Sequence, residues 1–300
     1  MFSTNFLIFL VVMRFEALRD LKEYRLLAAL AFADSVADFA YLFAGVYRTV
    51  LLLLSEENQL ISPSYCRLLP INSLRAFFGP AQHGMLVVVS LDRLLLVSKP
   101  LRYLKLGKTY AHRFILFTFM YCSSFGLGVV CWTAASRTQT EFISKNCKAR
   151  PTWGPLLPVL YTAIHLLCAV ASVVVNACVP VMNKKRMAKV AARERIASTT
   201  VKFQQELIRS VHLNCLCTFC LVVLPWLLLL FALNFVDAGF YQANRIGGWL
   251  LILSNVNPIF NIFIYMKNMK PMRIALRALI RNKQMPPNVK NWKSVAPAVK

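Results

Sequence analysis

Apolar runs of about 20 residues recur along the whole 300-residue chain. Each run is long enough to cross the roughly 30 Å hydrocarbon core of a bilayer as a helix. Lipid offers no partner to backbone N–H and C=O groups, so segments that cross it singly are α-helices. An apolar fraction of 58% is also higher than a soluble domain carries. The sequence therefore predicts an all-α bundle of membrane-spanning helices.

The first apolar segment is shorter than the others. Phe2 to Met13 supplies about 12 residues, or roughly 18 Å of helix, which cannot cross a bilayer. It has no basic region or small-residue cleavage site, so a cleaved signal peptide does not explain it. We expect seven helices, the first of which lacks its outer half. The other spans are expected at about 25–54, 66 or 71 to 98, 114–135, 156–182, 211–235 and 246–266.

Basic residues gather in alternate connecting segments. The segments after the first, third, fifth and last spans hold 26 of the 35 Lys and Arg residues. Basic loops stay cytoplasmic, which predicts an extracellular amino terminus and a cytoplasmic carboxyl terminus. The net charge of +23 then suits the anionic inner leaflet of the bilayer. This distribution argues against a nucleic-acid partner.

The region after the last span predicts an amphipathic helix on the inner membrane surface. Apolar side chains share one helical face and arginines another (Met272, Ala275, Leu276 and Leu279 against Arg273, Arg277 and Arg281). We expect a transmembrane domain over 1–266, this surface helix over 267–283, and a disordered basic tail over 284–300.

Several polar side chains fall at membrane depth, where an ionisable group costs several kcal/mol and needs a reason. If the helices bundle, these groups must face one another. One carboxylate among amides and a hydroxyl predicts a site for a monovalent cation such as Na⁺, or for water. A static hydrogen-bonded network is the alternative. The residues concerned are Asp34, Gln82, Ser254 and Asn257.

Arg75 precedes Arg93 by 18 residues, which is five helical turns, so both are expected to face the bundle interior. An inward Arg75 would favour a ligand that carries a carboxylate or another anion. Pairing with Asp38, or reaching outward, is the alternative for this cation. Aromatic and histidine side chains in the outer halves of other helices would line the same pocket, unless they serve only helix packing. The candidates are Asp38, Tyr41, Phe78, Tyr161, His165, Trp226 and Trp249.

Two cysteines differ from the others because they lie outside the apolar runs. Cys66 and Cys147 fall in segments assigned to the extracellular side. An oxidising exterior predicts a disulfide between them. The remaining cysteines lie in apolar runs, where a small apolar side chain is expected, and no spacing typical of a zinc site occurs.

A series of motifs resembles the rhodopsin-like G-protein-coupled receptors, and most closely the nematode serpentine chemoreceptors of the SX-like class. LAFAD, ending at Asp34, resembles the second-helix motif of that family, and Asn5 resembles its first-helix asparagine. DRLLLVSKPLRY, from Asp92 to Tyr103, resembles the DRY box and its loop proline. NPIFNIFIY, from Asn257 to Tyr265, resembles the NPxxY motif, and Pro225 the sixth-helix proline.

The resemblance implies a receptor in the plasma membrane that passes ligand binding to a heterotrimeric G protein. It implies a kink at the sixth-helix proline and an arginine released from an acidic partner. It implies no catalytic residue and no cofactor beyond a structural Na⁺. The coupling residues it implies are Asp92, Arg93, Glu206, Pro225, Asn257, Pro258 and Tyr265.

The chain departs from the family pattern at three switch positions. Leu94 replaces the DRY tyrosine, Asn261 the NPxxY tyrosine, and Val223 the tryptophan before the sixth-helix proline.

Other functions remain as alternatives. A transporter or channel would show internal repeats or helices broken in matching halves, and the sequence has neither. A membrane enzyme would need clustered His, Cys or carboxylate side chains at one depth. Within the receptor fold, the alternatives to a chemoreceptor are a neuropeptide receptor and a truncated receptor that does not signal.

Overall fold

The computed structural model describes residues 2–136, 142–147, 152–153, 156–191, 213, 215–225, 227–228, 256, 260, 263–264, 266–267 and 269–282. The helices are α1 (Phe2–Arg14), α2 (Glu16–Arg19), α3 (Lys22–Leu53), α4 (Pro63–Leu68), α5 (Pro70–Ser98), α6 (Pro100–Lys105), α7 (Lys108–Ser136), α9 (Leu156–Ala191) and α13 (Lys270–Ile280). A π-helical turn, η1, covers Phe219–Val223, and two short strands are β1 (Leu60–Ile61) and β2 (Ile143–Ser144).

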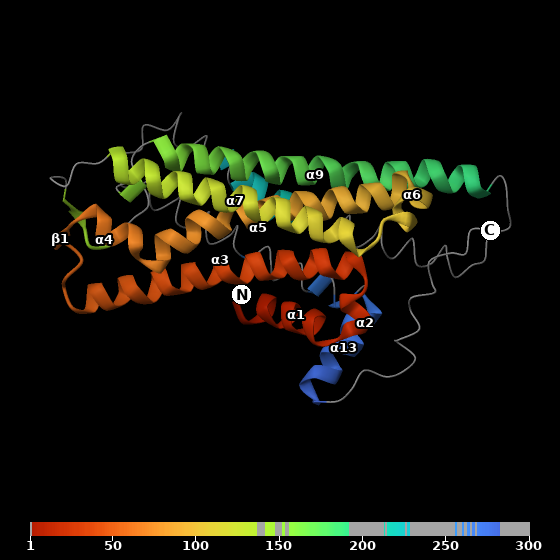
Figure 1. Cartoon of the computed structure of the whole chain (residues 1–300), viewed down its shortest axis with the longest axis horizontal. Helices are drawn as coiled ribbons and strands as arrows, with labels where there is room; N and C mark the ends of the chain where they lie inside the picture. Colours follow the sequence, from red (N-terminus) through yellow and green to blue (C-terminus); the bar gives the residue numbers. More distant parts are fainter. Residues whose placement is uncertain are drawn as a thin grey trace.

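Four of the described helices, α3, α5, α7 and α9, are long and apolar enough to cross a membrane. They run side by side along the long axis of the molecule, with α4 and β1 at one end and α2 and α6 at the other (Figure 1). We call these the disulfide end and the α6 end. The all-α bundle predicted from the apolar runs is confirmed, and each of the four helices overlaps its predicted span.

Proline places the start of three consecutive helices. Pro63, Pro70 and Pro100 each stand in the first turn of α4, α5 and α6. Proline suits this position because its missing N–H would have no partner there and its φ is already helical. Ser62 adds a cap to α4, since its hydroxyl accepts a hydrogen bond from the Ser64 N–H at 3.3 Å. The chain therefore breaks between α4 and α5, and the third span begins at Pro70 rather than at Cys66.

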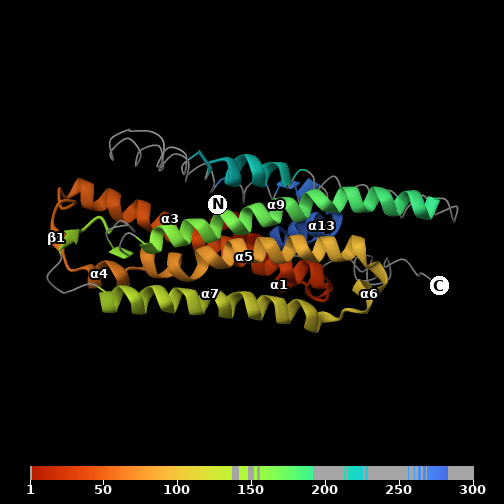
Figure 2. The same cartoon turned by 90° about the horizontal axis from the view of Figure 1, so that it is seen from above.

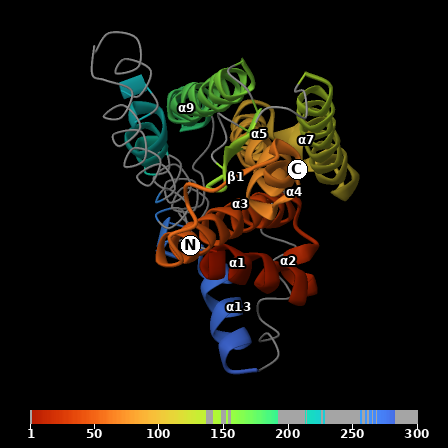
Figure 3. The ribbon, with the colours of Figure 1, turned by 90° about the vertical axis from the view of Figure 1, so that its left-hand side faces the viewer.

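α5 lies at the centre of the bundle, in contact with α3, α7 and α9 (Figures 2 and 3). Its inner half packs with α3 and α7 through Met85, Leu86 and Leu30, which are almost completely buried. The outward faces of α7 and α9 are apolar but exposed, for example at Phe117, Leu127 and Leu167. Exposed apolar surface of this extent is what lipid covers in a membrane protein.

α1 and α13 pack together beside α3 (Figure 3), in the half of the molecule that contains α2 and α6 (Figure 1). α1 is 13 residues long and is not among the helices long enough to span a bilayer, as its sequence predicted. The predicted amphipathic helix is present as α13: Met272 and Ala275 are buried, and Arg273 and Arg277 are exposed. α9 continues past its apolar span to Ala191, into the polar connection that follows the fifth span. The domain boundaries stay predictions.

Candidate functional site

A disulfide-centred clamp holds the start of α5. Cys66 and Cys147 are bonded, with their Cα atoms 5.1 Å apart, which confirms the predicted bridge. The Asn72 side chain, 1% exposed, donates from Nδ2 to the Cys66 carbonyl at 2.9 Å and to the Cys147 carbonyl at 3.2 Å. β1 and β2 pair antiparallel beside the bridge, with Ile61 opposite Ile143. The clamp therefore fixes the first turn of α5 against the connection between α7 and α9.

Arg75 follows Asn72 by one turn and lies among three aromatic rings. Its guanidinium carbon is 5.3 Å from the Tyr41 ring centroid, 5.5 Å from Tyr161 and 5.9 Å from Trp153. These distances fit cation–π attraction. Tyr161 also donates its hydroxyl to the Arg75 carbonyl at 3.4 Å. We call Arg75, Tyr41, Trp153 and Tyr161 the arginine cage.

The arginine cage continues inward as a column of stacked rings. Trp153 and Tyr161 meet edge to face at 5.5 Å, and Tyr161 lies 4.0 Å from the His165 ring. His165 in turn stacks on His83 at 4.0 Å. Gly79 makes this approach possible, because a Cβ there would lie 1.8 Å from the Tyr161 hydroxyl oxygen. The column places α9 directly against α5.

The cage has positive charge and no acidic residue among its members. Arg48, near the end of α3, lies close enough to Arg75 for the two charges to interact. Its Nε donates to the Asn146 carbonyl at 3.2 Å. Arg75 Nε is buried and has no hydrogen-bond partner within the described ranges. Buried donors are normally satisfied, so this one calls for an explanation.

The predicted pocket residues do not all lie around Arg75. Tyr41, Tyr161 and His165 lie with Arg75 or in its column, as described above. Asp38 accepts a hydrogen bond from Asn5 Nδ2 at 3.1 Å, and among the described residues no ion pair joins it to Arg75. Phe78 faces α3 and α7 instead, where it meets Phe32 and Phe119 edge to face. Trp226 and Trp249 lie outside the described residues.

Asp34 and Gln82 form the described part of the predicted polar network. Asp34 is 4% exposed, and the Gln82 side chain lies at hydrogen-bonding reach of its carboxylate. Carboxylate and amide oxygens are hard ligands suited to a hard cation or water. Ser254 and Asn257 lie outside the described residues, so the network and its Na⁺ stay a prediction. No group of three or more His, Cys, Asp or Glu side chains suited to a metal occurs in the described part of the chain.

At the α6 end, Tyr103 bridges two acidic residues. Its side chain is 2% exposed, and its hydroxyl lies 3.0 Å from Glu23 Oε1 and 3.1 Å from Asp92 Oδ2. Burial, with the charge of Glu23 and then of Asp92, raises the pKa of the Tyr103 hydroxyl. The hydroxyl therefore keeps its single proton, which the Glu23 and Asp92 carboxylates share as acceptors.

Lys22 covers the other side of the same tyrosine. Its Nζ lies 3.5 Å from the centroid of the Tyr103 ring and donates to the carbonyls of Tyr103 and Leu106, the latter at 3.0 Å. Arg93 is near enough for its charge to act on Asp92. Asp92 is thus joined to α6 by Tyr103, and Lys22 and Glu23 join that tyrosine to the start of α3. Glu206, Pro258 and Tyr265 lie outside the described residues, and Pro225 is buried after η1.

Sequence reasoning missed the residues whose role comes from long-range contacts. Trp153, Lys22 and Glu23 belong to no recognisable motif. Nothing in the sequence around His83 indicates that it stacks on His165. A further polar seam joins α5 to α9: the Ser90 hydroxyl lies 2.7 Å from that of Ser172, and Asn176 Nδ2 donates to Ser90 at 3.1 Å. Only the position of such side chains inside apolar runs could have flagged them.

The comparison with known proteins agrees with the helical bundle. Residues 4–265 match the family described as 7 transmembrane receptor (rhodopsin family). No curated protein matches the chain. The match confirms the receptor family and leaves the nematode chemoreceptor class a prediction. The chain therefore belongs to the rhodopsin family of seven-transmembrane receptors, which are multi-pass membrane proteins.

Proposed function

We propose that this receptor lies in the plasma membrane with its disulfide end outside, and that it senses an extracellular anionic chemical at the arginine cage. The observation that carries the proposal is Arg75 itself. It is a cation inside a bundle, surrounded by rings and without a carboxylate partner in the described part of the chain. Such a group at membrane depth is expensive and marks a functional site.

The charge around the cage supports an anionic ligand. A carboxylate or phosphate could accept from Arg75 Nε, which is unpaired among the described residues, and would be attracted by Arg48 as well. The rings of Tyr41, Trp153 and Tyr161 would hold an apolar or aromatic body attached to that anion. A chemosensory role for this ligand rests on the resemblance to serpentine chemoreceptors.

An acidic peptide is the second candidate ligand. The disulfide end carries further cations near the surface. Arg67 donates to the Thr133 carbonyl, and Lys145 pairs with Glu56. These residues would meet a ligand too large to enter the cage, and they favour acidic over basic peptides.

The α6 end supports coupling to a heterotrimeric G protein. Tyr103 connects α6 to both α3 and α5 through the carboxylates of Glu23 and Asp92. A ligand that favours another packing of these helices therefore acts on both contacts at once. A ligand shifts this equilibrium only by its difference in affinity between the two packings. We propose that the Tyr103 bridge belongs to the silent packing and that its loss exposes Asp92 and Arg93 to the G protein.

Replacing Tyr103 with Phe tests this assignment without a ligand. The substitution keeps the ring under Lys22 and removes only the hydroxyl. A hydrogen bond to a charged group contributes about 1.5–3 kcal/mol, so basal signalling should rise about tenfold or more. Reporter-cell signalling normalised to surface protein measures it, and Tyr121→Phe on the exposed face of α7 serves as the control. Unchanged or reduced basal signalling from well-expressed Tyr103→Phe would show that the bridge does not hold the silent packing.

A further inference from the structure

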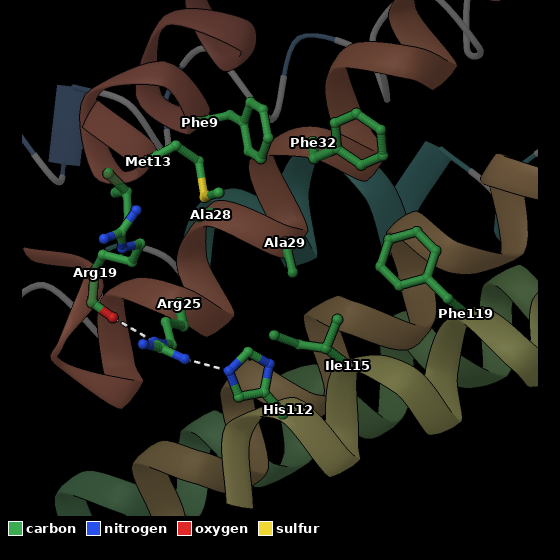
Figure 4. Close-up of a pocket in the computed structure, with 11 residues that line it drawn as sticks. Phe9, Met13, Arg19, Arg25, Ala28, Ala29, Phe32, His112, Ile115 and Phe119 are labelled. Carbon is green, nitrogen blue, oxygen red and sulfur yellow. Dashed lines mark hydrogen bonds between the residues drawn. The ribbon is translucent and has the colours of Figure 1, made fainter. Parts of the chain in front are cut away.

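An apolar groove of about 380 Å³ opens between α1, α3 and α7, away from the arginine cage. Its walls are the side chains of Phe9 and Val12 from α1, Ala28 and Phe32 from α3, and Ile115 and Phe119 from α7. The close-up in Figure 4 shows the three phenylalanine rings around one end of this space. The neighbouring outward residues of α7, Leu116 and Phe117, are 64% and 72% exposed, so the groove lies beside the surface that lipid covers.

Two arginines and a histidine occupy the opposite end of the groove. Arg19, Arg25 and His112 lie together there, as Figure 4 shows. Arg25 donates from Nε to the Arg19 carbonyl, and its Nη1 lies at hydrogen-bonding distance of His112 Nε2. These two contacts hold the guanidinium at the rim of the groove.

The negative charge of Asp20, the acidic residue nearest to this rim, is largely neutralised by Lys108. Asp20 Oδ1 lies 4.0 Å from Arg25 Nη2 but only 2.5 Å from Lys108 Nζ. Asp20 therefore pairs mainly with Lys108, and the rim keeps the positive charge of Arg19 and Arg25. The groove thus combines an apolar lining with a cationic rim, and it lies beside the lipid-facing surface. These features match a ligand that has an apolar tail and an anionic head.

We propose that this groove binds an anionic phospholipid of the inner leaflet. The acyl chain would lie along Phe9, Phe32 and Phe119, and the phosphate would meet Arg25 and Arg19. Burial of the chain supplies affinity in proportion to apolar area, and the headgroup gains from each nearby arginine. A zwitterionic lipid would place its choline at the same rim and gain little from the cations. The assignment to the inner leaflet rests on the proposed orientation of the receptor.

Photo-crosslinking of the full chain in nanodiscs tests the proposal. The probes are diazirine-bearing phosphatidic acid and phosphatidylcholine with the same acyl chains, each at equal trace fraction in phosphatidylcholine discs. Peptide mapping should find the anionic probe on segments 9–13 and 115–119, at about fivefold or more above the zwitterionic probe. Labelling of the exposed α9 face around Leu167 should be equal for the two probes, because that face has no cationic rim.

Four variants, one of them a control, locate the headgroup contact. Arg25→Gln and Arg19→Gln should each lower labelling by the anionic probe about fivefold and leave labelling by phosphatidylcholine unchanged. Arg113→Gln, beside His112 but outside the groove lining, is the matched control and should change neither. Asp20→Asn should strengthen labelling by the anionic probe, because Arg25 loses its nearest carboxylate. Since Arg19 is exposed, its substitution should leave folding intact.

Two results would overturn the proposal. One is equal labelling of the groove by both probes, which would make it a general lipid contact. The other is preferential labelling that survives both arginine substitutions. Neither readout needs a ligand, a G protein or a fixed orientation in the disc, so a receptor that fails to signal would still give the labelling pattern described.

Discussion

Replacing Cys66 and Cys147 together with serine is expected to lower the free energy of unfolding by about 2–5 kcal/mol and to remove most of the receptor from the cell surface. The bridge closes a loop of 81 residues in sequence separation, and the chain-entropy argument gives larger stabilisation for longer loops. The same bridge holds both carbonyls that accept from Asn72. Its loss therefore also releases the first turn of α5, one turn before Arg75.

Thermal unfolding of the purified receptor and surface labelling of intact cells measure this effect. Cys131→Ser is the matched control, because Cys131 is a free, exposed cysteine of α7 and its loss should change neither quantity. A double serine variant with the melting temperature and surface level of the parent would contradict a structural role for the bridge.

Replacing Arg75 with Gln is expected to weaken the response to activating anions by about 10- to 150-fold. A hydrogen bond to a charged group contributes about 1.5–3 kcal/mol, and Gln keeps a donor but loses the charge and the cation–π contacts with three rings. The measurement is a screen of carboxylates, phosphates and matched neutral analogues on reporter cells, followed by dose–response curves. Activating compounds should come from the anionic set.

Arg67→Gln provides the comparison for that screen. Arg67 also belongs to the disulfide end, but its donors serve the Thr133 carbonyl and the Ser64 hydroxyl. Its substitution should leave the potency of small anions unchanged. Activation by neutral or cationic compounds with equal potency on the parent and on Arg75→Gln would show that the cage is a packing feature and not the ligand site.

Much of the bundle follows from local sequence, because lipid imposes helices and fixes their minimum length. Apolar run length alone gave α3, α5, α7 and α9, and the three-to-four-residue spacing of apolar side chains gave α13. The disulfide was predictable because only Cys66 and Cys147 fall in segments assigned to the extracellular side. For the start of α5, the apolar pattern fits either Cys66 or Ile71. The junction between Leu69 and Pro70, which separates α4 from α5, decides between them.

The sites were less predictable because their partners come from distant parts of the chain. The spacing along the helix indicates that Arg75 faces inward. It does not indicate that Trp153 completes the arginine cage, or that Asn5 donates a hydrogen bond to Asp38. Phe78 is three residues from Arg75 on the same helix, and its side chain meets Phe32 and Phe119 instead of the cage. Lys22 and Glu23 looked like ordinary charges at a helix start, and only the fold brings them to Tyr103.

The most direct test of the account is nucleotide exchange by purified heterotrimeric G proteins mixed with the full chain in nanodiscs. Each G-protein class is tested with the parent chain, with Asp92→Asn and with Arg93→Gln. We expect at least one class to exchange nucleotide faster with Asp92→Asn than with the parent, and Arg93→Gln to remove the acceleration. Folded, membrane-inserted protein that accelerates no class in any of the three forms would contradict the claim that this receptor signals through a G protein.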